Sequence, residues 1–376
     1  MNIVISKAEL SKALSLTQSI VDRKTTMPIL MNLLLSATEG KLKIAATDLE
    51  ITAHVSVDAA VKTSGSTTVN AKILGDVVRE LPDGDVTLKL GASERLEISA
   101  MSSQFRVIGV SADEFPSLPG LAVETTSKLP ARELLDMISK TIYAVSHDET
   151  RFNLNGVCFE MHREGKGKSS TQELRLVATD GHRLAYISRP IAELDFEDGA
   201  IVPTKGLQEL KKVLELEGDG EIGLGVSDGF VVVETSLAKL SMRLIDGEFP
   251  DYNQVLPKKK GTIAEVSCAP LTQALRRAAL MVTDKGKGVR LDFNKNLLRV
   301  SSSSPELGES SEEMEIQYTG SDLTIGFNAR YLLDFASSVE EERNVSLELS
   351  GELGPARLRI AGDESYFGIV MPMRLA

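Results

Sequence analysis

The sequence predicts an α+β protein built from three copies of one unit, each with two helices on antiparallel sheets. The first observation is a pattern that repeats three times. Each copy has a short amphipathic helix, strands of alternating polarity, a second helix that begins near a Lys or Arg, and more strands. The second helices begin at residues 70–72, 203–205 and 328–330. Their cations, Lys72, Lys205 and Arg330, lie 133 and then 125 residues apart.

The second observation is that short runs of residues return with the same period. Residues 46–49 (ATDL) return as 178–181 (ATDG), 132 positions later, and residues 114–116 (EFP) return as 248–250, 134 positions later. A period near the modal size of a domain indicates three domains. Such a repeat favours an assembly or a ring over a single catalytic cleft.

The helices follow from apolar residues at the 3.6-residue period. In the fourth helix, Leu207, Leu210 and Leu214 share a face that leaves Lys211 and Lys212 toward solvent. The same period predicts six helices over residues 7–24, 71–81, 131–145, 204–215, 270–287 and 328–339.

Between the helices the period drops to two, as in residues 86–90 and 240–244, which predicts half-buried antiparallel strands. Composition places linkers near 117–128 and 257–264, and a loose serine-rich, acidic stretch at 301–311. Helices on antiparallel sheets make an α+β domain. We therefore expect three domains, which we call the first, central and third repeats, over residues 1–120, 128–256 and 262–376.

The charge is divided between the predicted elements. The net charge of −12 argues by itself against a nucleic-acid partner. However, the six predicted helices hold 16 Lys or Arg and 10 Asp or Glu, a net of +6, which leaves −18 elsewhere. Because Glu favours helices as much as Lys does, propensity alone does not explain this split, and we expect two electrostatic faces.

Other compartments and chemistries find no support in the sequence. We expect no signal peptide, and the sequence has no apolar run long enough to span a membrane. The cysteines, Cys158 and Cys268, lie in different repeats, so we expect no disulfide and a cytoplasmic protein. The four histidines lack zinc spacing, and we expect no metal and no cofactor.

Three apparent motifs are better explained as turns. Residues 218–223 fit G-x-G-x-x-G but follow a helix and lead into strands, the reverse of the dinucleotide context. Residues 167–169 (GKS) read as a polar hairpin tip. Asp48 and Asp180 recur without partner carboxylates, so a turn or cap role is favoured over a metal role.

Two stretches carry more polar or flexible apolar side chains than a turn or a terminal strand needs. One is residues 176–184, where His182 and Arg183 add polar groups at a turn. The other is the C-terminal tail, in which Met371, Met373 and Leu375 are flexible apolar groups suited to an adaptable binding surface. Together they suggest a groove for a partner peptide, with an edge strand that simply ends as the alternative.

These residues resemble a known family. The blocks TDGHRL at 179–184, GEFPDY at 247–252, GVRL at 288–291 and MPMRL at 371–375, with MPIL at 27–30 and TDLE at 47–50, are similar to the bacterial DNA polymerase III β subunit, the sliding clamp. The similarity runs from residue 1 to 375. The resemblance implies a DNA-clamp fold in a head-to-tail homodimer, a ring of six domains that has no catalytic activity.

The resemblance also implies partners. Duplex DNA would pass through the ring without sequence readout, held by salt-sensitive phosphate contacts. The replicative polymerase catalytic subunit, the clamp loader and repair polymerases would bind a groove through a short peptide. Gln254 stands on the groove rim where better-known members tend to have Arg. By position, the groove comprises Leu154, Thr179, Gly181, His182, Arg183, Leu184, Pro250, Val255, Val370, Met371, Pro372, Met373, Arg374 and Leu375.

Two further sets of residues are carried over by position. The DNA-binding set is Lys24, Arg151, Phe152, Asn153 and Lys205, with Asn153 standing where well-known members have an aromatic residue. In the second set, which would form the dimer interface, Phe105 would meet Leu280 and Met281, and Lys72 would pair with Glu312 and Glu313.

Two rival functions stay open on the residues alone. One is an acidic three-repeat scaffold that never touches DNA. The other is a metal-dependent hydrolase that uses Asp48 and Asp180.

Overall fold

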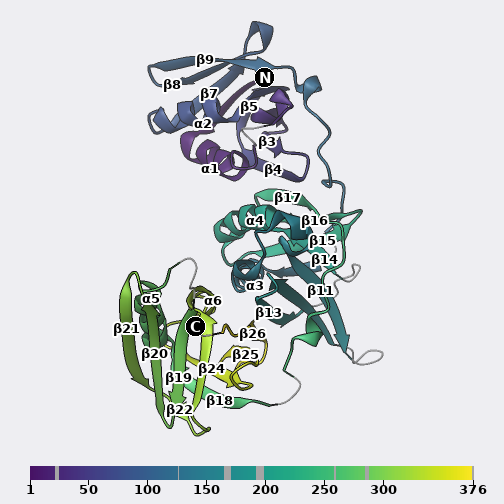
Figure 1. Ribbon diagram of the computed structural model, residues 1–376. Helices are drawn as coiled ribbons and strands as arrows, with labels where there is room; N and C mark the ends of the chain where they lie inside the picture. Colours follow the sequence, from purple (N-terminus) through teal and green to yellow (C-terminus); the bar gives the residue numbers. More distant parts are fainter. Residues whose placement is uncertain are drawn as a thin grey trace. The chain divides into compact units, whose positions relative to one another are not determined.

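The computed structural model describes residues 1–21, 25–125, 127–164, 171–191, 199–257, 260–283 and 288–374 (Figure 1). These ranges contain six α-helices, two in each repeat, which confirms the predicted pattern. Their bounds are α1 (Lys7–Thr17), α2 (Ala71–Glu80), α3 (Ala131–Ser139), α4 (Thr204–Glu217), α5 (Cys268–Ala279) and α6 (Ala329–Ala336).

Most helices end earlier than the periodicity predicts. The predicted helix 131–145 ends at Ser139, because the Thr141 hydroxyl donates to the carbonyls of Met137 and Ile138, and a 3₁₀ turn, η4 (Ile142–Ala144), follows. Buried residues continue at helical spacing through this turn, which is why the pattern overruns. Helices α1 and α5 end at Thr17 and Ala279, also before the predicted ends at 24 and 287, although residues 22–24 and 284–287 lie outside the described ranges.

The internal contacts divide the chain into two compact units. The first unit comprises residues 1–135 and 192–244. Its sheet has the order β10-β15-β16-β17-β4-β3-β2-β6-β9-β8-β7-β1-β5. The strand bounds are β1 (Asn2–Ser6), β2 (Asn32–Thr38), β3 (Lys41–Thr47), β4 (Ile51–Asp58), β5 (Ala60–Thr63), β6 (Gly65–Asn70), β7 (Asp85–Leu90), β8 (Arg95–Ala100), β9 (Ser103–Val110), β10 (Ser127–Pro130), β14 (Ala200–Pro203), β15 (Glu221–Ser227), β16 (Phe230–Glu234) and β17 (Ala238–Arg243).

The second unit comprises residues 136–191 and 245–376. One sheet runs β11-β12-β13-β26-β25-β24-β18-β22 and another runs β21-β20-β19-β23. The strand bounds are β11 (Gly156–Glu164), β12 (Thr171–Thr179), β13 (Arg183–Pro190), β18 (Thr262–Ser267), β19 (Gly288–Asn294), β20 (Leu297–Ser304), β21 (Gly308–Glu315), β22 (Gln317–Tyr318), β23 (Leu323–Asn328), β24 (Asn344–Leu349), β25 (Ala356–Ile360) and β26 (Tyr366–Val370).

The sheets run across the borders of the repeats. In the first unit, β17 of the central repeat pairs antiparallel with β4 of the first repeat. In the second unit, β13 of the central repeat pairs antiparallel with β26 of the third. The central repeat is therefore shared between the two units, and each junction between repeats is a continuous β-ladder.

The helices pack on the sheets through their apolar faces. In the first unit, α1 contacts β3, β4 and α2 (Figure 1), and its side chains Leu10, Ala13 and Leu14 are buried. In the second unit, α5 packs on β20 and beside α6. None of the helices in the described ranges is long and apolar enough to cross a membrane.

The prediction of a loose stretch at 301–311 is wrong. Residues 297–304 and 308–315 form the hairpin of β20 and β21, with Ser301 opposite Ser311. Ser302 and Ser304 are buried, and the Ser302 hydroxyl donates to the Ala278 carbonyl of α5. Serine therefore occupies core-facing positions here, because its hydroxyl finds a partner.

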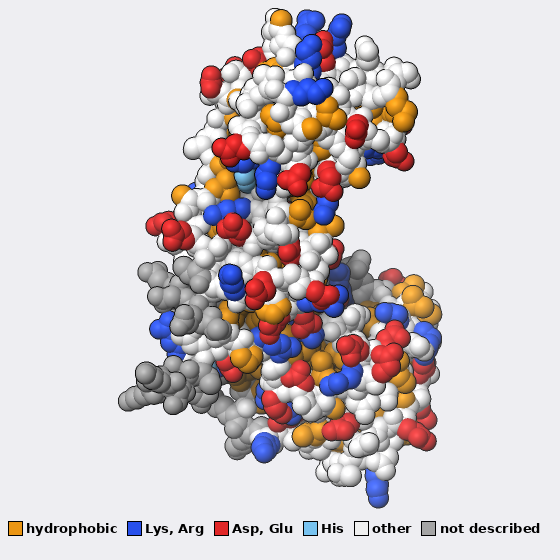
Figure 2. All heavy atoms as spheres, turned by 180° about the vertical axis from the view of Figure 1, so that it is seen from behind, with side chains coloured by type: hydrophobic (Ala, Val, Ile, Leu, Met, Phe, Trp, Pro, Cys, Tyr) orange, Lys and Arg blue, Asp and Glu red, His pale blue; other side chains and the backbone are white. Residues whose placement is uncertain are grey.

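The charge split is smaller than predicted. The six observed helices hold eleven Lys or Arg and nine Asp or Glu, a net of +2, which leaves −14 for the remainder. The predicted +6 counted cations beyond the helix ends, such as Lys140. On the face drawn in Figure 2, acidic and basic side chains are interspersed rather than segregated.

Candidate peptide pocket and interfaces

A tight turn between β12 and β13 forms one side of the candidate site. The Asp180 carboxylate accepts hydrogen bonds from the backbone N–H groups of His182 and Arg183, at 2.9 and 3.0 Å. The Thr179 hydroxyl donates to the Arg183 carbonyl at 2.6 Å. Gly181 lies between them at φ +85°, a conformation that costs other residues steric strain. The turn is thus fixed by its own side chains.

The first repeat contains the same turn. The Asp48 carboxylate accepts from the backbone N–H groups of Glu50 and Ile51 at 3.0 and 2.6 Å, and Leu49 takes the positive φ, +76°. The turn role predicted for Asp48 and Asp180 is confirmed. Among the described residues, no group of three acidic, histidine or cysteine side chains is placed to hold a metal.

The other two apparent motifs have separate outcomes. Gly218 follows the end of α4 at φ +65°, and β15 begins at Glu221, so residues 218–220 form the predicted turn and residues 221–223 begin the strand. Residues 167–169 lie outside the described ranges.

A pocket of about 140 Å³ lies beside the Thr179–Leu184 turn. Nine of the fourteen predicted groove residues line it: Leu154, Thr179, Gly181, His182, Arg183, Leu184, Pro250, Val255 and Met371. Three lining residues were missed, namely Asp251, Tyr252 and Ile369. The first two belong to the GEFPDY block, so the resemblance held the signal for them.

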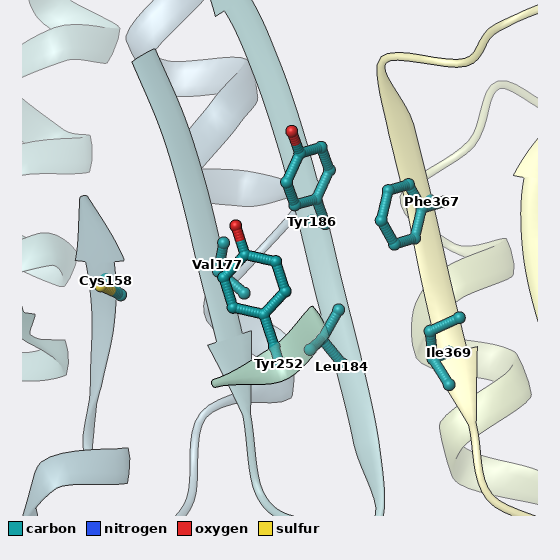
Figure 3. Close-up of a cluster of buried hydrophobic side chains, with 7 residues drawn as sticks. All are labelled: Cys158, Val177, Leu184, Tyr186, Tyr252, Phe367 and Ile369. Carbon is teal, nitrogen blue, oxygen red and sulfur yellow. The ribbon is translucent and has the colours of Figure 1, made fainter. Parts of the chain in front are cut away.

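The floor of the pocket belongs to a buried apolar cluster of seven residues (Figure 3). Tyr186 of β13 stacks on Phe367 of β26, with ring centroids 4.5 Å apart, and Tyr252 lies over Leu184 and Val177. The cluster is completed by Cys158 and Ile369.

Tyr252 belongs to η7 (Tyr252–Gln254), in the last residues of the central repeat. Its hydroxyl donates to Glu160 at 2.8 Å, and burial together with this carboxylate raises the pKa of Tyr252 far above its ordinary value. Because the neutral hydroxyl is held in place, this segment is fixed to the sheet beneath the pocket.

Two backbone hydrogen bonds attach the C-terminal tail, one to the turn beside the pocket and one to β23. The Met371 N–H donates to the His182 carbonyl at 2.9 Å, and the Met373 N–H donates to the Gly326 carbonyl at 2.8 Å. Met371 lines the pocket, whereas Val370 is buried in β26. Pro372, Met373 and Arg374 are not among the lining residues. Leu375 lies outside the described residues.

A second, more open pocket of about 780 Å³ shares the wall formed by Val255 and Met371. Gln254 lines it, and its side-chain amide donates to Asp251 at 3.3 Å. Hydrogen bonds from the side chains of Asn253 and Gln254 lower the pKa of Asp251. At the rim of the groove, the neutral Gln254 amide is therefore held by the Asp251 carboxylate.

The DNA-binding candidates occupy three different environments. Arg151 and Phe152 lie in η5 (Glu149–Leu154), where the Arg151 guanidinium donates to the Asp180 carbonyl and the Phe152 ring is 57% exposed. The Asn153 amide donates to the Glu248 carbonyl, so it serves the fold. Lys205 pairs with Asp48 in the first unit. Lys24 lies outside the described residues.

The dimer candidates lie on strands and near helix ends, and they are exposed or half-buried. Phe105 of β9 is 39% exposed and Leu280, just after α5, is 69% exposed; Met281 is half-buried. Lys72 is exposed at the start of α2. The two acidic candidates already have partners within the chain, because Arg277 pairs with Glu312 and Arg299 pairs with Glu313.

Comparison with known proteins covers the whole chain. Residues 1–119, 128–251 and 253–374 match the N-terminal, central and C-terminal domains of the DNA polymerase III beta subunit. The chain is 34% identical to the beta sliding clamp of Escherichia coli over 378 aligned positions, which cover all of both proteins.

Solved structures give the same result. A crystal structure of the Caulobacter crescentus beta sliding clamp superposes with a TM-score of 0.91 at 34% identity, and covers all of both chains. The sliding clamp of Bartonella birtlesii, solved bound to griselimycin, gives a TM-score of 0.92 at 31% identity, also over both full chains. With a full-length match in sequence, in all three domains and in fold, the chain belongs to the DNA polymerase III β-subunit family, the non-catalytic DNA sliding clamps of replication.

Proposed function

We propose that two copies of this chain close head to tail into a ring around duplex DNA, with residues 1–120, 128–256 and 262–376 as its three domains. The ring would hold the replicative polymerase on its template without reading sequence, in the cytoplasm where the chromosome is copied. The observation that carries the proposal is that the two junctions between repeats are built in a similar way. The first and third repeats each expose one side of a further junction of this kind, which two copies would complete together.

The first junction joins the first and central repeats. Strand β17 pairs with β4, placing Met242 opposite Ile51. On α4, Lys205 pairs with the turn residue Asp48, and Glu209 accepts from the hydroxyl of Ser19, which lies two residues after the end of α1. In this junction the first repeat contributes β4, the Asp48 turn and the residues after α1. The central repeat contributes its last strand, β17, and its second helix, α4.

The second junction joins the central and third repeats in the same way. Strand β13 pairs with β26, placing Arg183 opposite Val370. On α6, Asp334 lies four residues after Arg330, as Glu209 lies four after Lys205, and it pairs with Arg183 beside the turn. The repeat therefore specifies the interface as well as the domain.

The exposed halves are β9 of the first repeat and β21 of the third. β21 is an edge strand whose residues are exposed or half-buried. β9 pairs with β8 over residues 103–108 but with β6 only at Gly109 and Val110, so among the described strands residues 103–108 have no partner on their other side, and Ile108 is 76% exposed. Unpaired strand edges of this kind are templates for another chain. By repeat equivalence, Gly308 corresponds to Ile51 and Arg183, and Ile108 to Met242. We therefore expect Gly308 to lie opposite Ile108 of the other copy.

The same equivalence predicts side-chain contacts at the proposed interface between the two copies, which we call the seam. The three-residue turn 305–307 corresponds to 48–50, so Lys72 would meet Glu306 rather than Glu312 or Glu313. Leu280 lies twelve residues after the start of its helix, as Ser19 does, so it would lie against α2 of the other copy. A pocket of about 450 Å³ beside α2, lined by Lys72 and Asp76 among others, is available for it.

Inside the ring, contacts with the duplex would be made by Lys24, Arg151, Phe152, Asn153 and Lys205. Phosphate contacts of this kind are independent of sequence and weaken with salt. The exposed Phe152 ring and the half-exposed Lys205 side chain are accessible to a ligand.

The pocket at Met371 would take a short peptide carried by the polymerase, the clamp loader and repair polymerases. Its apolar floor and the backbone groups of the turn provide an apolar anchor with polar positioning. Griselimycin, which is bound in the Bartonella birtlesii clamp structure, is a suitable probe. Truncation after Val370 should abolish griselimycin binding in a calorimetric titration and leave the dimer intact.

Images of single particles of the purified protein test the ring itself. We expect a closed ring with a central opening wide enough for a double helix. A solid particle of the mass of one chain would refute the proposal.

A further inference from the structure

Arg183 was predicted to contact the partner peptide, but its guanidinium is turned into the protein. The residue lines the pocket, yet its side chain is only 9% exposed. The guanidinium donates to Asp180, Asp334 and the carbonyl of Tyr143. It also lies 4.5 Å from the centroid of the Tyr331 ring.

These contacts join three separate elements. Asp180 belongs to the turn that forms the pocket wall, Tyr143 belongs to η4 of the central repeat, and Asp334 belongs to α6 of the third repeat. None of the residues of α6 lines the pocket. Arg183 is therefore the direct ionic link between the pocket wall and α6.

The junction between the first and central repeats forms without an equivalent of the Arg183 bridge. There, Ile51 occupies the position of Arg183, and Lys205 pairs directly with the turn. Glu209, the equivalent of Asp334, is satisfied by Ser19 and Lys212. The guanidinium bridge thus occurs at the junction that carries the pocket.

We propose that Arg183 is a positioning residue that couples α6 to the peptide pocket. Its planar guanidinium binds one carboxylate on each side, so a shift of α6 moves Asp180 and the backbone of the pocket wall with it. Binding sites lose affinity when supporting side chains release the groups that contact the ligand. This inference rests on the proposed role of the pocket.

The test compares Asp334→Asn with the matched control Glu209→Gln in the full-length protein. Each change removes one partly buried carboxylate charge at a junction, so both should lower Tm by a similar few degrees. In a calorimetric titration with griselimycin, we expect Asp334→Asn to weaken binding about 5- to 20-fold. Glu209→Gln should bind as the wild type does.

A second measurement separates positioning from general stability. Coupling between two sites is reciprocal, so griselimycin should slow amide hydrogen exchange in residues 332–336 of α6 in the wild type. This protection should be lost in Asp334→Asn and kept in Glu209→Gln. A purely structural role would not link the ligand to exchange in α6.

Arg183→Lys keeps the test decisive if Asp334→Asn folds poorly. A lysine supplies a compact charge that cannot bridge both carboxylates in the same geometry. It should weaken griselimycin binding as Asp334→Asn does, and the double variant should bind no more weakly than either single variant.

Two results would overturn the inference: an affinity of Asp334→Asn within twofold of the wild type, or an equal loss in Glu209→Gln. Failure of the wild type to bind griselimycin at all would instead refute the proposed role of the pocket.

Discussion

Lys205 on α4 pairs with Asp48 in the turn between β3 and β4, although the two residues lie 157 positions apart and in different repeats. The pair lies at the end of the ladder that joins β17 to β4. Its energetic contribution is modest, because Lys205 is half exposed. Its significance is geometric, because a turn, a strand edge and a second helix meet in a similar way at the second junction. We propose that β21 and the part of β9 that does not pair with β6 meet likewise between two copies.

The register of the seam can be tested with engineered cysteines. If Gly308 lies opposite Ile108, then Ser310 lies opposite Arg106 of the other copy. Opposed residues on paired strands fall within the Cα separation that a disulfide requires. Under mild oxidation, the double variant Arg106→Cys with Ser310→Cys should therefore form a covalent dimer on a non-reducing gel.

The control for this experiment moves one cysteine out of register. In Arg106→Cys with Glu315→Cys, the second cysteine is displaced by five residues, roughly 17 Å along the strand. The native Cys158 and Cys268 are buried and should not contribute. Equal crosslinking in both double variants would show that the strands do not pair in this register.

Leu280 and Met281 should be needed for the dimer. Changing both to Asp would bury carboxylates without partners, which costs several kcal/mol and corresponds to a dimer at least about 100-fold weaker. Light scattering should then report a single chain. Leu353→Asp is a suitable control because Leu353 is 79% exposed. A variant that stays dimeric at micromolar concentration would place the seam elsewhere.

Gly181→Ala should lower both stability and ligand affinity. A side chain at φ +85° costs about 1–2 kcal/mol, and the added Cβ would lie 3.0 Å from the Arg151 guanidinium. Gly229, at φ +75° with no neighbour within 4 Å of its Cβ, provides the matched control. Both alanine variants should melt earlier, and only Gly181→Ala should bind griselimycin more weakly. A similar griselimycin affinity in the two variants would show that the conformation of the Thr179–Leu184 turn does not affect ligand binding.

His54 should make the first junction sensitive to acid. Burial, and then the charges of Lys43 and Lys239, lower the pKa of His54 below 6.5. The folded state therefore binds fewer protons than the unfolded state just below pH 6.5, so stability is full above that pH and falls as the pH drops. Tm should fall more steeply between pH 7 and 5.5 in the wild type than in His54→Gln. Parallel curves would contradict this.

The sequence was sufficient for the features that depend on local pattern. The three-fold period, the paired helices and the Asp turns are all present, because turn chemistry and amphipathic spacing act over a few residues. The overlong prediction for residues 131–145 has the same origin: buried residues keep helical spacing through the η4 turn after α3. Spacing alone does not distinguish an α-helix from the 3₁₀ turn that continues it.

What the sequence could not show depends on distant partners. The hairpin of β20 and β21 has serine on both faces, so its alternation is invisible until the Ser302 hydroxyl meets Ala278. The direction of the Arg183 side chain is set by Asp334, 151 residues later in the chain. The ladders across the repeat borders likewise depend on residues far apart in the chain.

Retention on DNA tests the central claim most directly. The protein is loaded by its clamp loader onto nicked circular duplex and isolated by gel filtration, and the DNA is then cut once with a restriction enzyme. We predict that the protein stays with the circle at moderate salt and is lost when the same DNA is made linear. Equal retention on circular and linear DNA would contradict encirclement.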